Sequence, residues 1–265
     1  MNPEPIAVTG ISALFAGSPD VASFWRNIVA GRDLITDVPP SHWLSSDYYD
    51  PDPHAPDKVY CNRGSFLDSV GFDALKYGLP PSNIPATDTS QLLGLMVADK
   101  LFQSIAPDAF NRIDRERMSV IIGVTGATEL TAHMSGRMAR PQWEQGLRDS
   151  GLPDAEVKRI ADQIAAQFVP WQESTFPGLL GNVVAGRIAN RFDLGGTNCI
   201  VDAACASSLG ALSMAINELR LGQAVALGDL EAAIPHRREG GEANRIDIPH
   251  SADADLWEGA ERGHV

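Results

Sequence analysis

A strand, a tight turn and a helix follow one another without a linker in residues 198–222. Residues 198–201 are rich in β-forming side chains, Cys205 stands in the turn, and Gly222 ends a run with helical spacing. The apolar positions of that run are Leu209, Leu212, Ile216 and Leu219. A direct connection of this kind is typical of layered α/β folds, in which helices pack on a sheet.

The turn gives Cys205 the surroundings of a nucleophile. The thiol is predicted to lie at a helix N-terminus, where amide hydrogens and the positive end of the helix dipole favour the thiolate. Small neighbours leave room for a substrate, namely Ala203, Ala204, Ala206 and Ser207. Enzymes that transfer acyl groups through a serine nucleophile present it on a similar strand-to-helix elbow, so Cys205 is the predicted catalytic residue.

The polar and sulfur-containing neighbours are assigned supporting roles. Asp202 is expected to cap or hydrogen-bond the turn, and Ser207 and Ser208 are expected to satisfy the first turn of the helix. Cys199 is predicted to lie in the core, and Cys61 has no evident partner. The three cysteines form neither a metal set nor a disulfide framework, which favours free thiols in a reducing compartment.

Strands and helices are expected to alternate along the rest of the chain. Residues 6–11 and 119–124 are predicted strands, and the second, being β-branched and apolar, is expected to be fully buried. Residues 21–29 and 89–105 have helical spacing. Five prolines make residues 37–63 an irregular excursion. The pattern predicts an α/β layered architecture.

Residues 133–170 are interpreted as an insertion with a helix of its own. Asp154 is a plausible N-cap. The apolar stripe consists of Val157, Ile160, Ile164 and Phe168. Core packing is the expected role of this stripe, and shaping a substrate entrance is the alternative. A second helix is predicted over residues 178–192, with small residues that let it pack closely against the nucleophile segment.

At the cysteine turn the chain resembles the β-ketoacyl synthase (ketosynthase) family of polyketide and fatty-acid synthases. Residues 202–208 match that family's Asp-x-Ala-Cys-x-Ser-Ser context. The resemblance covers about residues 6–223 and is carried by segments 6–12, 24–25, 31–33, 38–43, 64–67, 72–73, 119–123 and 181–190. Segment 169–178 is similar to the iterative synthases that make polyunsaturated fatty acids and enediyne or related polyketides.

The resemblance implies a fold, a reaction and partners. The fold would be α/β, the N-terminal half of a thiolase-like layered fold. An acyl thioester would form on Cys205 and condense with a malonyl-carrier unit. The substrates would be carried on the phosphopantetheine of an acyl carrier protein, with no cofactor bound by the chain itself. The strand before Cys205, about residues 197–201, would pair with its copy in a homodimer.

The family's second half brings a His-Gly-Thr histidine, a Lys-Ser-Asn-x-Gly-His motif and a glycine-rich loop, and none of these motifs occurs in this sequence. We therefore expect a truncated ketosynthase-like domain over residues 1–223. Residues 224–265 are expected to be an unrelated, irregular tail, disordered by composition, from a shifted reading frame or a truncated gene. Loss of the second half would also expose an apolar surface that another chain can cover.

The histidines of the chain are not expected to replace the missing ones. His236, His250 and His264 lie in the tail, and His42, His54 and His133 are predicted in loops or at loop edges, without a rigid element to hold them against Cys205. Carbon–carbon bond formation is therefore expected to be impaired, although acylation of Cys205 needs only a thiolate and oxyanion donors.

Composition excludes several other classes of protein. A net charge of -13 argues against nucleic-acid binding, and no apolar run approaches the roughly 18 residues of a membrane span. No nucleotide-binding glycine motif or metal set is visible, and the expected location is the cytoplasm. Arg187 and Arg191 are candidates for a local basic patch that docks an acidic carrier, with a solvated helix face as the alternative.

Three functional readings follow from the sequence. The first is a ketosynthase-type acyltransferase that uses Cys205. The second is a non-catalytic module that dimerises or pairs with a chain supplying the missing half. The third is a non-functional gene fragment.

Overall fold

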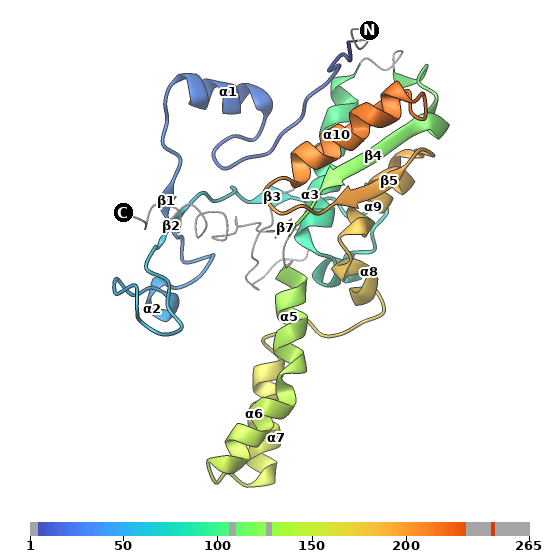
Figure 1. Cartoon of the computed structure of the whole chain (residues 1–265). Coiled ribbons are helices and arrows are strands. Elements are labelled where there is room, and N and C mark those ends of the chain that lie inside the picture. Colours follow the sequence, from blue (N-terminus) through green and yellow to red (C-terminus); the bar gives the residue numbers. More distant parts are fainter. Residues whose placement is uncertain (1–4, 106–109, 126–128, 232–244, 247–265) are drawn as a thin grey trace.

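The computed structural model describes residues 5–105, 110–125, 129–231 and 245–246 (Figure 1). The helices are α1 (Val21–Val29), α2 (Ser45–Tyr48), α3 (Thr89–Ser104), α5 (Glu129–Met138), α6 (Arg140–Asp149), α7 (Asp154–Ala165), α8 (Thr175–Leu179), α9 (Asn182–Phe192) and α10 (Ser207–Arg220). Short 3₁₀ turns span Pro81–Ala86 and Arg115–Arg117. The strands are β1 (Thr36–Asp37), β2 (Arg63–Gly64), β3 (Val70–Gly71), β4 (Met118–Gly123), β5 (Asn198–Val201), β6 (Ala226–Glu231) and β7 (Arg245–Ile246).

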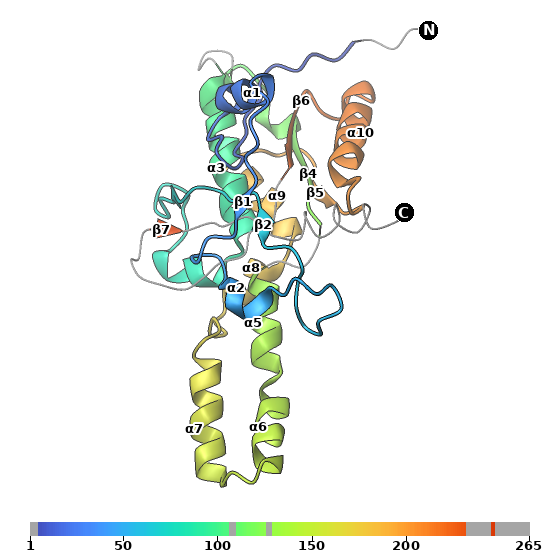
Figure 2. The same ribbon diagram turned by 90° about the vertical axis from the view of Figure 1, so that its left-hand side faces the viewer.

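A parallel sheet forms the centre of the molecule, with β4 between β5 and β6. All six residues of β4 are buried, as predicted for a central strand of β-branched residues. Helices α3 and α9 cover one face of the sheet and α10 covers the other (Figure 2). The predicted α/β layering is therefore confirmed.

Helix α10 approaches the sheet through its small residues. Ala211 and Ala215 are buried against Ile121, and a Cβ on Gly123 would lie only 2.7 Å from the backbone nitrogen of Ser208. The apolar positions from which this helix was predicted do not form its buried face, since Leu209 is 73% exposed. Close backbone approach selects small residues on the buried face, so helical spacing alone did not reveal which face packs.

Several predicted elements have their expected bounds. Helix α1 matches residues 21–29 and begins with a capping box in which Asp20 and Ser23 exchange hydrogen bonds. Strand β5 and helix α3 also lie where they were predicted. The proline-rich residues 37–63 are irregular apart from α2 and the ends of β1 and β2.

The prediction of one continuous helix over residues 178–192 is wrong near its start, where helical structure is interrupted between α8 and α9. Helix α8 ends at Leu179, Leu180 is extended, and α9 begins at Asn182. The carbonyl groups of Gly178 and Leu180 accept hydrogen bonds from the side chain of Gln91, which draws them out of a continuous helical ladder. Helix α9 packs closely on the sheet as predicted, since a Cβ on Gly181 would lie 3.1 Å from Ile200.

Helices α5, α6 and α7 project from the sheet as a helical arm (Figures 1 and 2). The predicted stripe does not reach the sheet. It lies within the arm, where Val157 is fully buried and the other three members are half-buried. Phe168 stacks on Trp143 with 5.5 Å between ring centroids. The N-cap of α7 is Pro153, whereas Asp154 lies in the first turn and pairs with Arg148 at 3.2 Å.

Two expectations about strands are corrected. Residues 6–11 are extended but belong to no strand, because they cross between α3 and α10 without joining the sheet. Conversely, residues 226–231 form β6, which pairs with β4 along its whole length. The prediction of an irregular tail from residue 224 onward is therefore wrong for residues 226–231. The remaining tail lies outside the described residues, except for β7, which pairs antiparallel with β3.

Candidate functional site

Cys205 lies at the carboxyl end of β5, in the turn that leads into α10, and is exposed. The residue before it, Ala204, has a φ of 49°, in the left-handed region that favours glycine. A non-glycine residue in this region stores strain, and such strain is typical of sites where a side chain must be held in a particular direction. The backbone thus forms the predicted sharp elbow at the thiol.

Asp202 holds the elbow from one side. Its Oδ1 accepts a hydrogen bond from the Thr125 hydroxyl at 2.6 Å and another from the backbone N–H of Ala204 at 3.3 Å. The bond from Thr125, followed by that from Ala204, lowers the pKa of Asp202 below its ordinary value. A lowered pKa makes a weaker base, so Asp202 supports the turn, as predicted, and is poorly suited to accept a proton.

Ser207 holds the elbow from the other side. Its buried hydroxyl accepts a hydrogen bond from the N–H of Ala203 at 2.9 Å and donates one to the carbonyl of Ala204 at 2.6 Å. Ser207 is also the first residue of α10, so Cys205 precedes the helix by two positions. The positive end of the helix dipole therefore faces the elbow.

The other two cysteines differ from Cys205 in their surroundings. Cys199 is half-buried in β5, with its sulfur 3.9 Å from that of Met214. Burial, with a smaller contribution from Glu218, raises the pKa of the Cys199 thiol, so less thiolate forms there. Cys61 is exposed but lies in the irregular segment before β2. Cys205 is thus the exposed thiol at the edge of the sheet.

The described histidines occupy other parts of the fold. His42 is buried with its ring edge against Phe66, in the proline-rich segment. The expectation that His133 lies in a loop or at a loop edge is wrong, because it is inside α5, where its Nδ1 accepts a hydrogen bond from the N–H of Val169 at 3.3 Å. His236, His250 and His264 lie outside the described residues.

The two arginines proposed for carrier docking differ in how far they are buried. Arg191 is exposed on α9, but Arg187 is half-buried and its Nε donates a hydrogen bond to Oε1 of Gln91 at 2.6 Å. Burial lowers the pKa of the Arg187 guanidinium. The structure therefore turns Arg187 inward, and a basic patch made of these two residues is not formed.

Two residues, one at this edge of the sheet and one in α3, were not singled out from the sequence. Thr125 follows β4 and reaches Asp202, which follows the neighbouring strand β5. Because the carboxyl ends of parallel strands share one edge, the position of Thr125 after a buried strand was the available signal. Gln91 gave a weaker signal, as the last of five polar residues that precede the apolar run of α3.

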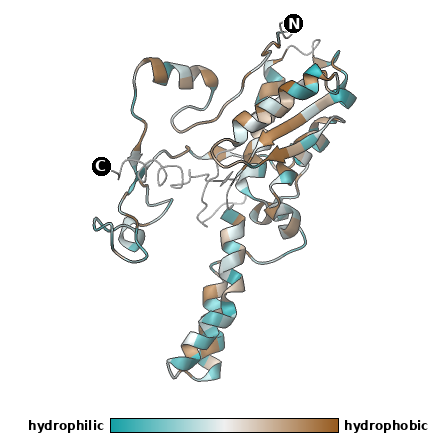
Figure 3. Cartoon of the chain, in the orientation of Figure 1, coloured by the Kyte–Doolittle hydropathy of each residue, from teal (hydrophilic) through white to brown (hydrophobic). Residues whose placement is uncertain are grey.

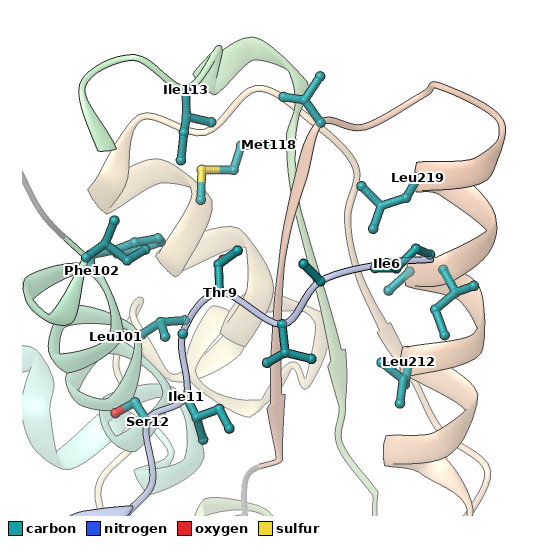
Figure 4. Close-up of a pocket in the computed structure, with 17 residues that line it drawn as sticks. Ile6, Thr9, Ile11, Ser12, Leu101, Phe102, Ile113, Met118, Leu212 and Leu219 are labelled. Atoms are coloured by element: carbon teal, nitrogen blue, oxygen red, sulfur yellow. The ribbon is translucent and has the colours of Figure 1, made fainter. Parts of the chain in front are cut away.

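A largely apolar cavity of about 370 Å³ lies at the opposite edge of the sheet (Figure 4). It is bounded by Leu101 and Phe102 of α3, Met118 at the start of β4, and Leu212 and Leu219 of α10, with residues 6–12 crossing it. Since Met118 begins the strand and Cys205 follows the far end of its neighbour, this cavity does not adjoin the thiol.

The described residues contain no group of three metal-binding side chains and no helix long and apolar enough to cross a membrane. The site is a single exposed thiol on a strand-to-helix elbow of a parallel α/β sheet. A cysteine in this position is a candidate nucleophile, because nucleophilic side chains are often presented on such elbows.

Comparison with known proteins identifies the family. Residues 3–236 match the model of the β-ketoacyl synthase N-terminal domain, and the chain belongs to this family. The matched range includes β6 as well as the elbow. The expected resemblance to ketosynthases is thereby confirmed.

The relatives include a polyunsaturated fatty acid synthase and several polyketide synthases. A polyunsaturated fatty acid synthase chain of Thraustochytrium sp. is 36% identical over 214 residues, which cover 81% of this chain and 8% of that protein. A phenolphthiocerol/phthiocerol polyketide synthase chain of Mycobacterium tuberculosis is 32% identical over 222 residues, covering 82% of this chain and 12% of the relative. The chain thus spans a small part of the length of these relatives.

Solved ketosynthase structures show the same fold. The oxazolomycin ketosynthase domain OzmH KS7 of Streptomyces albus JA3453 aligns with a TM-score of 0.60 at 23% identity, over 82% of this chain and 32% of that one. The PfaC keto synthase-chain length factor aligns with a TM-score of 0.68 at 17% identity, over 87% of this chain and 24% of the other. The described fold is therefore the N-terminal half of a thiolase-like layered fold, as expected.

Proposed function

We propose that this chain provides the acyl-accepting part of a ketosynthase site, with Cys205 as the nucleophile. The observation that carries the proposal is the exposed thiol on a strained, doubly hydrogen-bonded elbow at the N-terminus of α10. Family membership supports the reaction class, a condensing acyl transfer in polyketide or fatty-acid biosynthesis.

The acyl transfer is a thioester exchange. The Cys205 thiolate attacks the carbonyl carbon of an acyl thioester, and the carbonyl electrons move to oxygen, where the backbone amide of Cys205 itself would stabilise the charge. Collapse of this intermediate expels the donor's thiolate, which takes up a proton, and leaves the acyl group on Cys205. The donor would be the phosphopantetheine of an acyl carrier protein.

Condensation with a malonyl-carrier unit would be a second step. Decarboxylation of a malonyl-carrier unit generates an enolate, and the histidine motifs that the family uses for it do not occur in this sequence. The residues of this sequence thus support the acyl-loading step of the reaction. A cytoplasmic location would fit its carrier-bound substrates.

A non-catalytic interaction module is the second candidate, and the exposed apolar residues of α10 favour it. Leu209, Leu212 and Leu221 are all exposed on or just after this helix, and β5 is an edge strand of the sheet. A homodimer through residues 197–201, or a chain supplying the missing half, would cover such surfaces. Size-exclusion chromatography with light scattering, on the chain alone and mixed with that half, distinguishes these partners.

The acyl-transfer proposal is tested by intact mass after incubation with an acyl-N-acetylcysteamine thioester. We expect the unchanged chain to gain one acyl group and Cys205→Ala to gain none. Cys61→Ala is the matched control, because it removes another exposed thiol and should leave the gain intact. A folded, unchanged chain that gains no mass would exclude the acyltransferase and favour the interaction module.

A further inference from the structure

A run of buried polar residues begins α3 and plays no part in the acyl transfer described above. Residues 87–91 are all buried, and Gln91 is 0% exposed within the apolar core around it. A buried amide must have hydrogen-bond partners, because desolvating it without them costs about 1–3 kcal/mol. The partners of Gln91 therefore show what this residue holds in place.

The side chain of Gln91 joins the start of α3 to residues 177–187, which are far from it in the sequence. Its Nε2 donates to the carbonyl oxygens of Pro177 at 2.9 Å, Gly178 at 3.0 Å and Leu180 at 3.2 Å. Its Oε1 accepts the hydrogen bond from Arg187. Because a guanidinium only donates, Arg187 fixes the amide with its oxygen toward α9 and its two hydrogens toward the three carbonyls.

The segment that Gln91 holds, residues 177–181, packs against the strand ends that lead to the elbow. A Cβ on Gly181 would lie 3.1 Å from Cδ1 of Ile200 in β5 and 3.7 Å from Cγ1 of Val124, which follows β4. The segment has little freedom, since a Cβ on Gly178 would lie 1.8 Å from the carbonyl oxygen of Ala86. Gln91, the 177–181 turn and β5 thus form one continuous packed path to the elbow.

We propose that Gln91, oriented by Arg187, is a positioning residue for the reaction of Cys205. It fixes the turn of residues 177–181 against the ends of β4 and β5, and these ends set where the elbow presents its thiol. The inference rests on the proposed acyl transfer and identifies a residue, remote from sulfur, on which its rate depends.

The substitution Gln91→Glu tests the donor role while keeping the shape of the side chain. The carboxylate still accepts the hydrogen bond from Arg187 and gains an ion pair, but its second oxygen faces three carbonyl oxygens without a hydrogen to share. The turn should therefore move away while the packing around position 91 keeps its volume. Arg187→Lys is the second variant, which keeps the positive charge but releases the amide orientation.

The matched control is Gln172→Glu. Gln172 also donates from Nε2 to a backbone carbonyl, that of Ser82 at 3.1 Å, but its other partner is the Ser174 hydroxyl. The substitution therefore introduces the same charge change at the other end of α8. Thermal melting of each variant, read before the kinetics, identifies the fraction of chain that is folded.

The experiment measures acylation of the full chain by an acyl-N-acetylcysteamine thioester over a range of concentrations. For Gln91→Glu we expect the limiting rate to fall about tenfold with an unchanged half-saturating concentration, because misplacing a reacting group lowers the rate of the chemical step. Arg187→Lys should show a smaller fall of the same kind, and Gln172→Glu should match the unchanged chain.

Two results overturn the inference alone. One is an unchanged limiting rate in folded Gln91→Glu and Arg187→Lys while the unchanged chain is acylated. The other is a fall that only follows the folded fraction or is matched by Gln172→Glu, either of which indicates a purely structural role. If the unchanged chain itself is not acylated, the proposed function fails, and this inference fails with it.

Discussion

The central sheet and the helical arm are both regular structures, but different interactions hold them together. In β4 every residue is buried, and Ile121 and Ile122 are 0% exposed between helices on both faces. In the arm, α6 has no buried residue, and Arg140 bridges Glu144 at 2.8 Å and Asp162 at 2.7 Å on the surface. Figure 3 shows the contrast as brown strands against an arm with much teal.

The comparison indicates how the molecule can open. The sheet depends on apolar contacts from α3, α9 and α10 together, so it should unfold as one unit. The arm buries one narrow stripe between two helices and joins the body at the base of α5, so it should open separately and at lower cost. The elbow that carries Cys205 belongs to the sheet and is expected to share its rigidity.

Truncating the buried centre of β4 should have the largest effect. Ile122→Ala removes three carbons from a fully buried site, which costs about 2–5 kcal/mol. We expect the whole chain to be destabilised, including the elbow, as measured by denaturant unfolding with far-UV circular dichroism. A loss confined to one helix would contradict cooperative unfolding of the body.

The corresponding truncation in the arm should have a smaller and local effect. Val157→Ala removes two carbons from a fully buried position in α7, an expected cost of about 1–3 kcal/mol. Hydrogen exchange followed by mass spectrometry should show faster exchange in residues 139–166 and unchanged exchange in β4. Faster exchange in both regions would mean that arm and sheet are one unit.

Relieving strain at the elbow should stabilise the body modestly. Ala204→Gly permits a φ of 49° without steric cost, and we expect a gain of about 1 kcal/mol in the free energy of unfolding. Ala203→Gly is the matched control and should destabilise, because Ala203 has no such conformation to relieve. Destabilisation by Ala204→Gly, measured by thermal melting, would show that no strain is stored there.

Acid should lower the stability of the arm before that of the sheet, and this is the smallest of the four predicted effects. Arg140 lowers the pKa of Glu144 below its ordinary value, so this pairing stabilises the arm above the carboxyl's unfolded pKa. The contribution is lost as pH falls through the lowered value in the folded chain. Hydrogen exchange in α6 should therefore quicken at acid pH, and Glu144→Gln should remove that dependence. An arm of unchanged stability across this range would contradict the comparison.

The same comparison explains what the sequence could predict. The run of β4 was identified because full burial of a central strand leaves a strong apolar signal. The half-buried β5 and the elbow were identified from the residues around Cys205. The hydrogen bond from Thr125 to Asp202 joins residues 77 positions apart, so no local sequence pattern predicts it. Long-range hydrogen bonds of this kind depend on strand order, which the sequence left open.

The remaining errors have similar causes. Strand β6 carries no strong apolar alternation and is defined by its pairing with β4, so composition alone assigned it to an irregular tail. Residues 6–11 have the alternation of a strand but lie across α3 and α10 instead. Arg187 appeared to be a surface charge from its helical position, whereas Gln91 of another helix turns it inward.

The most direct test of the central claim is to locate the acyl group after reaction with the thioester. Trypsin should release residues 192–220 as one peptide, which contains both Cys199 and Cys205, and fragment ions distinguish these two residues. We predict the added acyl mass on Cys205, with Cys199 and the exposed Cys61 unmodified. Acylation of Cys61 to the same extent as Cys205 would contradict the account, because exposure alone would then explain the reaction.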